Sequence, residues 1–204
     1  HFGYFMTEST GHLSEYVPWF RSSQRALDLY CDQPAFGGAS GAYFNYCNML
    51  AEKYKSVDYL ATESKKIERR SVEYCSYILE AAETGNVFRL NGNVRNDGYI
   101  TNLPQGCCVE VPCLVDKSGI QPTHIGMLPP HLAALIQTNV NVQALTVEAA
   151  LTGKRDLIYH AAMLDPHTAA ELDLDQIWAL VDDLFQVSQL DAGGLPLNLE
   201  PDSL

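Results

Sequence analysis

The middle of the chain, from residue 86 to residue 115, constrains the fold more than any other part of the sequence. Three short runs of β-type composition lie there, at residues 86–91, 99–103 and 108–115. Turn signals separate them: Asn91-Gly92, Asn96-Asp97-Gly98 and Pro104-Gln105-Gly106. Strands this close in sequence pair most simply as antiparallel neighbours. The sequence therefore predicts an antiparallel sheet in the middle of the chain.

The last third of the chain has helical periodicity. Residues 131–151 carry a broad apolar face after Pro129 and Pro130, which the first turn of a helix accepts, and Gly153 ends the pattern. Residues 156–163 predict a second helix. Asp175 predicts the cap of a third helix over residues 176–187.

The first part of the chain gives weaker signals. Residues 62–84 predict one long helix that stops at Gly85, because apolar side chains recur there at helical spacing. Residues 14–20 predict a short helix interrupted at Pro18. Residues 32–48 contain three glycines and a proline and predict an irregular loop.

Together these patterns predict one α+β domain over residues 1–190, followed by a flexible tail over residues 191–204. The sequence contains no internal repeat and no obvious linker.

Composition and charge exclude several function classes. The formal net charge of −12 argues against a nucleic-acid surface, which needs clustered Lys and Arg. No apolar run of about 18 residues is present, so we expect no membrane span. The six cysteines form no C-x-x-C pair and are expected as free thiols of a cytoplasmic protein, with a soft-metal site at Cys107-Cys108 as the alternative. No dinucleotide fingerprint, P-loop or catalytic Ser or zinc motif occurs, so the residues alone reveal no complete active site.

Four stretches resemble the family 4 glycoside hydrolases. They follow the family order from residue 3 to about residue 187, and four in order are specific although each is modest alone. The stretches are Gly3-Tyr4-Phe5-Met6-Thr7-Glu8-Ser9-Thr10-Gly11-His12 with Glu15-Tyr16-Val17-Pro18-Trp19-Phe20, Gly98-Tyr99-Ile100-Thr101-Asn102-Leu103-Pro104 with Val109-Glu110-Val111-Pro112, Leu145-Thr146-Val147-Glu148-Ala149-Ala150, and Ala161-Ala162-Met163-Leu164-Asp165-Pro166.

The resemblance implies a fold and places this chain within it. Family members pair an N-terminal Rossmann domain with a C-terminal α+β domain like that of lactate and malate dehydrogenases, which has an antiparallel sheet and long helices. This chain resembles the C-terminal part. The Rossmann domain and the Cys and His that bind the metal would precede His1, so we interpret the start as a cut through a larger protein, and we expect no metal ligand in this chain.

The resemblance also implies an activity. Family members hydrolyse α-galactosides, α-glucosides or α-uronides with NAD and a divalent metal, usually Mn²⁺, through oxidation, elimination, addition and reduction. The first motif is closer to the subgroup that uses non-phosphorylated substrates. We expect a cytoplasmic homo-oligomer that binds a small glycoside, and we expect this chain to be inactive in isolation.

Six residues of these motifs are candidates for the site. Tyr4, Glu8 and His12 are the candidate catalytic residues, because the family's base lies near the first motif. Ser9, Asn96 and Asn102 are the candidate substrate-binding residues. The alternatives are a packed aromatic ring for Tyr4, a cap or solvated charge for Glu8, and structural hydrogen bonds for His12 and the two asparagines.

Two other function classes remain open at this stage. The chain could be a noncatalytic piece that supports oligomerisation or lines the substrate site. It could also belong to a hydroxy-acid dehydrogenase, which shares the fold. The motifs favour the glycosidase branch.

Overall fold

The computed structural model of the chain describes residues 1–6, 10–30, 42–55 and 70–191. Two compact units form: one combines residues 1–55 with 135–204, and the other contains residues 56–134. We call them the helical unit and the sheet unit and describe each by itself.

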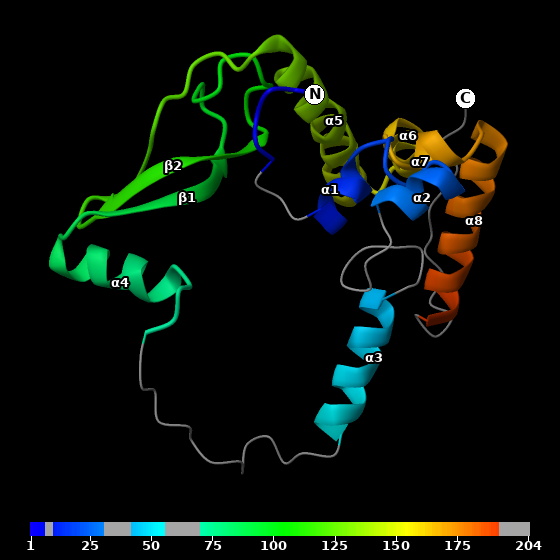
Figure 1. The fold of residues 1–204 in the computed structure, drawn as a ribbon, viewed down its shortest axis with the longest axis horizontal. Helices are drawn as coiled ribbons and strands as arrows, with labels where there is room; N and C mark the ends of the chain where they lie inside the picture. Colours follow the sequence, from blue (N-terminus) through cyan, green and yellow to red (C-terminus); the bar gives the residue numbers. More distant parts are fainter. Residues whose placement is uncertain (7–9, 31–41, 56–69, 192–204) are drawn as a thin grey trace. The chain divides into compact units, whose positions relative to one another are not determined.

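Three antiparallel strands form the sheet of the sheet unit, in the order β1-β2-β3. Figure 1 labels β1 and β2. β1 is Phe88–Arg95, β2 is Cys108–Asp116 and β3 is Gly119–Pro122. The helix α4, Cys75–Thr84, packs on β1 and β2. This arrangement confirms the predicted α+β class and the antiparallel sheet.

One face of the sheet carries the core of the sheet unit. β2 buries every second side chain, and the side chains of β1 on this face are half-buried. Loop residues before β2 and residues at the start of the helix α5, Pro130–Thr152, pack on this face. The buried cluster is Ile100, Leu103, Val109, Val111, Cys113 and Ala133.

Two expectations for this region were wrong in detail. Asn91 and Gly92 lie inside β1, whose register runs without a break from Phe88 opposite Val115 to Arg95 opposite Cys108. A Cβ added at Gly92 would lie 3.1 Å from the Sγ atom of Cys113. Glycine at this position therefore lets the backbone of β1 pass close to the Cys113 side chain, and it does not form a turn. Residues 99–103 form a turn, from which only Ile100 makes a single bridge, with Gly126.

The strand β3 was not predicted, because four residues that begin with glycine and end with proline give little strand signal. The predicted turns at Asn96-Asp97-Gly98 and Pro104-Gln105-Gly106 are present. Gly98 and Gly106 adopt φ angles of 93° and 85°, a region that favours glycine.

The helix predicted over residues 62–84 is shorter at its start. Residues 62–69 lie outside the described residues, and residues 70–74 are not helical. The hydroxyl of Ser71 accepts the N–H of Glu73, and Arg70 turns back onto α4, with its guanidinium 3.7 Å from the centre of the Tyr77 ring. Gly85 ends α4 as predicted: its φ is 81°, and its N–H donates to the carbonyl of Ala81.

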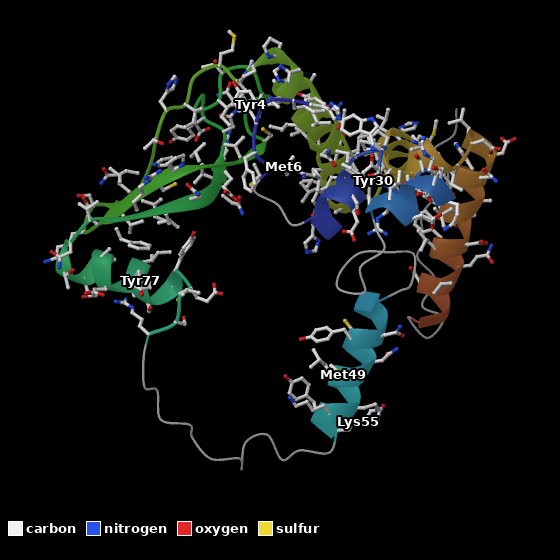
Figure 2. The ribbon with its side chains drawn as sticks, in the orientation of Figure 1. Tyr4, Met6, Tyr30, Met49, Lys55 and Tyr77 are labelled. Atoms are coloured by element: carbon white, nitrogen blue, oxygen red, sulfur yellow. The ribbon has the colours of Figure 1, made fainter. Side chains whose placement is uncertain are left out.

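Aromatic contacts hold α4 on the sheet. The Tyr77 ring, labelled in Figure 2, stacks on the Phe88 ring at the start of β1 with the centroids 5.2 Å apart. Tyr74 meets the same ring edge-on at 6.1 Å.

The helical unit contains α1, Thr10–Tyr16, α2, Gln24–Tyr30, α3, Ala42–Lys55, α6, Asp156–Leu164, α7, Thr168–Glu171, and α8, Leu174–Asp191. α5, Pro130–Thr152, begins in the sheet unit and continues into the helical unit. Its start at Pro130 and its end before Gly153 match the prediction.

Residues 42–48 are helical and not the predicted loop, because no glycine or proline follows Gly41 in this stretch. No helix of the described residues could cross a membrane.

The helices α6 and α8 pack through a buried tyrosine. The Tyr159 ring stacks on Trp178 with the centroids 4.3 Å apart, and its hydroxyl donates to the carboxylate of Asp182. The guanidinium of Arg155 lies 3.5 Å from Asp182 and 4.0 Å from the centre of the Phe185 ring. Burial and the hydrogen bond to Asp182 together raise the pKa of Tyr159 above its usual value.

The cap of α8 is Asp173 and not Asp175. The Asp173 carboxylate accepts the N–H of Gln176 at 2.9 Å, and the Gln176 side chain accepts the N–H of Asp173 at 2.9 Å. This reciprocal pair is a capping box, so the helix begins earlier than residue 176. Asp191, the first residue of the predicted tail, ends α8, and residues 192–204 lie outside the described residues.

Candidate functional site

The first motif begins with an exposed tyrosine. Tyr4, labelled in Figure 2, lies in an irregular segment after Gly3, which has a φ of 76°. Tyr4 is 62% exposed, so solvent reaches it. Glu8 and Ser9 lie outside the described residues.

His12 lies on α1 with its ring half exposed. Its Nδ1 atom is 3.5 Å from a carboxylate oxygen of Glu15, one turn further along the helix. α1 ends at Tyr16, because Pro18 disfavours a helical conformation at the residue before it. The structure thus places an imidazole and a carboxylate of the first motif side by side at the surface.

Two buried residues and two hydrogen bonds hold α1 in place. Ser14 and Val17 are each 2% exposed. The Nε atom of Arg21 donates to the hydroxyl of Ser14 at 2.8 Å, and the amide of Asn139 donates to the carbonyl of Tyr16 at 3.2 Å. His12 and Glu15 are therefore presented by a helix whose opposite side is anchored.

Asn96 is buried in the loop between β1 and β2. Its Nδ2 atom donates to the carbonyls of Ile100, Leu103 and Pro104 at 2.9, 3.3 and 3.1 Å, and its Oδ1 atom accepts the N–H of Ile100 at 3.0 Å. The side chain is 1% exposed. Asn96 therefore organises the loop, which is the structural alternative that we gave to substrate contact.

Asn102 joins this loop to the segment before α5. Its amide donates to the carbonyl of Leu128 at 2.8 Å and accepts the N–H of Leu128 at 2.9 Å. The N–H of Thr101 donates to the carbonyl of Gly126 beside it. The two asparagines thus lie in one loop, and both hydrogen-bond backbone groups.

The segment from Thr123 to Leu128 was not singled out from the sequence, although the structure places it against the candidate Asn102. Gly126, with a φ of 84°, is the signal that could have marked it as a turn with a fixed position.

Cys107 also contacts Asn96. Burial raises the pKa of its thiol above the usual value, and a hydrogen bond with Asn96 opposes the rise. The thiols of Cys47, Cys75, Cys107, Cys108 and Cys113 are free. Among the described residues, no group of three or more His, Cys, Asp and Glu could hold a metal ion. Neither Cys107 nor Cys108 belongs to such a group.

Tyr4 and His12 belong to the helical unit, and Asn96 and Asn102 to the sheet unit. The structure brings His12 beside Glu15 and places the two asparagines in one loop, each within its own unit.

Comparison with known proteins decides the family. The model of the family 4 glycosyl hydrolase C-terminal domain matches residues 1–168. This chain belongs to family 4 of the glycosyl hydrolases. Its motifs are those of the family's C-terminal domain, which confirms the resemblance that the sequence showed.

The relatives within family 4 include two α-galactosidases. The α-galactosidase of Bacillus subtilis is 42% identical over 90% of this chain and 42% of its own length. The α-galactosidase of Rhizobium meliloti is 39% identical over 90% of this chain and 38% of its own length. The chain thus spans about two fifths of the length of these curated relatives.

The fold is that of solved family 4 enzymes. The 6-phospho-β-glucosidase of Thermotoga maritima, solved with manganese, NAD⁺ and glucose-6-phosphate, superposes with a TM-score of 0.54 at 22% identity. The match covers 72% of this chain and 34% of that chain. At this identity the likeness establishes the fold alone.

Proposed function

We propose that the protein to which this chain belongs is an α-galactosidase of family 4. The observation that carries the proposal is the similarity to the two α-galactosidases, which extends over 90% of the chain at 42% and 39% identity. The phosphoglucosidases match less of it: one is 28% identical over 72% of the chain and another 31% identical over 55%. A non-phosphorylated α-galactoside is therefore the preferred substrate in this proposal.

The proposed reaction needs NAD and Mn²⁺, as the family resemblance implies. A solved family 4 structure that contains both supports this requirement. The described residues include no metal-binding cluster, so the proposal assigns the metal ligands and the NAD site to residues outside them. Residues 1–190 would contribute as the substrate-side domain of a cytoplasmic enzyme.

Within this chain, we assign proton transfer to Tyr4, Glu8 or His12 and substrate contact to Ser9. The exposed ring of Tyr4 and the exposed pair of His12 with Glu15 support this assignment, since a group that acts on substrate must be accessible. The roles of Asn96 and Asn102 in the proposal are to hold the loop around Leu103, because the amides of both bind backbone groups.

The first experiment tests the class of enzyme. The complete protein is assayed with p-nitrophenyl α-galactoside and p-nitrophenyl α-glucoside, with and without NAD and Mn²⁺. We expect turnover of the galactoside that requires both additions. Equal turnover without NAD would contradict the proposed chemistry, and preference for the glucoside would contradict the proposed substrate.

The second experiment tests the residues. Glu8→Gln and His12→Ala should each lower kcat/KM by about 100-fold or more if the group takes part in proton transfer. His160→Ala is the matched control, because this histidine is also exposed and lies on α6 outside the motif. A substrate deuterated at C2 should show a larger isotope effect in a variant that lacks the base. Wild-type kinetics with a lowered melting temperature would assign both residues a structural role.

A further inference from the structure

The two ends of the first motif meet through an aromatic contact. The rings of Phe2 and Trp19 lie with their centroids 5.6 Å apart and their planes inclined by 34°. The three residues to which we assign proton transfer, Tyr4, Glu8 and His12, lie between these two in sequence. The contact therefore closes a loop of the helical unit, and the indole ring of Trp19 belongs to the loop that carries the candidate site.

The indole ring is held in place and is still open to solvent. Trp19 lies in the turn after α1, and its neighbour Val17 is buried. Phe2 contacts one part of the Trp19 ring, yet Trp19 is 47% exposed. A large ring that its neighbours hold in place can bind a flat apolar surface at little cost in conformational entropy.

A galactosyl group presents such a surface. Its 4-hydroxyl is axial, so the C–H groups at C3, C4 and C5 lie together on the opposite face of the sugar ring. In a glucosyl group the 4-hydroxyl is equatorial, and the C–H group at C4 lies on the other face, which divides this apolar patch. An indole ring therefore covers more C–H surface on galactose than on glucose, and apolar contact of this kind favours binding.

The same loop also supplies polar groups for the hydroxyls of a sugar. The side chains of His12 and Glu15 are half exposed and lie 3.5 Å apart, and Tyr4 is exposed. Small-molecule sites commonly combine aromatic surface with a few polar groups that fix the orientation of the ligand. The composition of the loop thus suits a ligand that has one apolar face and a polar rim, as a galactoside has.

We propose that the indole ring of Trp19 stacks on the apolar face of the galactosyl group and that Phe2 supports this ring. The inference rests on the proposed function, and it adds a binding residue that sets the preference for galactosides over glucosides. Stacking acts on the bound substrate and on the transition state alike, so Trp19 contributes to affinity and not to the chemical step.

The test measures affinity and turnover separately, on the complete protein with NAD and Mn²⁺. Trp19→Leu should raise the KM for p-nitrophenyl α-galactoside and the inhibition constant of D-galactose about tenfold each, and should leave kcat within about threefold. The inhibition constant of D-glucose should change less than threefold, because glucose loses less stacking. Trp19→Phe keeps a flat ring and should stay within about threefold of wild type in every constant.

The matched control is Trp178→Leu. Trp178 is also 47% exposed, but it lies on α8 outside the first motif and stacks on Tyr159. This variant should leave both inhibition constants unchanged. Melting temperatures of all variants separate a loss of stability from a loss of sugar binding.

Three results would overturn the proposal. An unchanged inhibition constant of D-galactose in Trp19→Leu, with a lowered melting temperature, would mean that Trp19 packs on another part of the protein. Equal changes for D-galactose and D-glucose would contradict the role in specificity. A fall in kcat alone would assign Trp19 to the chemical step.

Failure of the proposed function gives a different result. If the wild-type protein hydrolyses no α-galactoside, the proposed function is wrong, and calorimetric titration with D-galactose then tests the stacking alone. Binding to wild type that Trp19→Leu weakens about tenfold would support the stacking, whereas no binding, or equal binding by both proteins, would overturn it.

Discussion

Replacing Asn96 should strongly destabilise the sheet unit, because this buried side chain bonds backbone groups of Ile100, Leu103 and Pro104. Asn96→Ala leaves the N–H of Ile100 without a partner inside the core, and a buried unpaired donor costs about 1–3 kcal/mol. The amide nitrogen also serves three carbonyls with two hydrogens, and each lost bond adds about 1 kcal/mol. The expected total is about 3–5 kcal/mol.

Asn102→Ala is the matched comparison. It also removes an amide that bonds backbone groups, but it loses only the two bonds to Leu128, which are partly buried. The expected loss is about 1–2 kcal/mol. The difference between the two variants therefore measures the burial and the larger number of bonds at Asn96.

Cysteine labelling reports this opening without involving the helical unit. The thiol of Cys113 is 0% exposed in the core of the sheet unit and should react only when the unit opens. A loss of 3 kcal/mol should speed its alkylation about 150-fold, and a loss of 1.4 kcal/mol about tenfold. Peptide mass spectrometry follows the reaction, with the exposed Cys75 as an internal reference. Equal labelling rates in the two variants, or less than a threefold change in Asn96→Ala, would refute the reasoning.

Three further substitutions test single contacts. Gly92→Ala should destabilise the sheet unit by about 1–3 kcal/mol, because the added methyl group crowds Cys113. Cys113→Ala should relieve part of this loss in the double variant. If chemical denaturation shows that the two losses of stability simply add, the crowding explanation is wrong. Asp173→Ala should destabilise α8 by about 1 kcal/mol in thermal unfolding, whereas Asp175→Ala should change little, and equal effects would argue against the capping box. Because the pKa of Tyr159 is raised in the folded protein, folding favours the protonated phenol. This stability is present below the usual tyrosine pKa of 10.0 and is lost as the pH rises above that value and the phenol ionises. Melting temperatures between pH 8 and pH 11 should therefore fall less steeply for Tyr159→Phe than for wild type, and parallel curves would contradict this origin.

The sequence predicted the parts of the fold that depend on local periodicity. The helices α5 and α6 and the stop at Gly85 were placed to within about one residue, since apolar spacing and glycine conformation are local properties. Errors arose where one residue type is found both in turns and at close contacts between strands, as glycine is. Gly92 predicts a turn from its sequence neighbour Asn91, but a cysteine on another strand decides its position.

The candidate site was less accessible to sequence reasoning. Asn96 and Asn102 look alike in sequence, each near a turn, yet their partners are carbonyls up to 26 residues away, which no local pattern reveals. His12 and Glu15 are closer to a local rule, because side chains three apart on a helix are neighbours. The pairing of these two could have been predicted once α1 was recognised as a helix.

The bonds between Asn102 and Leu128 also bear on the order of folding of the sheet unit. They join residues 26 apart, and β2 and β3 lie between them, whereas β2 and β3 are connected by a tight turn from Asp116 to Gly119. Closing a long loop costs more entropy than closing a short one, so the β2–β3 hairpin should form first and the long connection late. Interactions that are absent from the transition state act on the unfolding rate. Asn102 would then govern how long the folded sheet unit persists, with little influence on how fast it is reached.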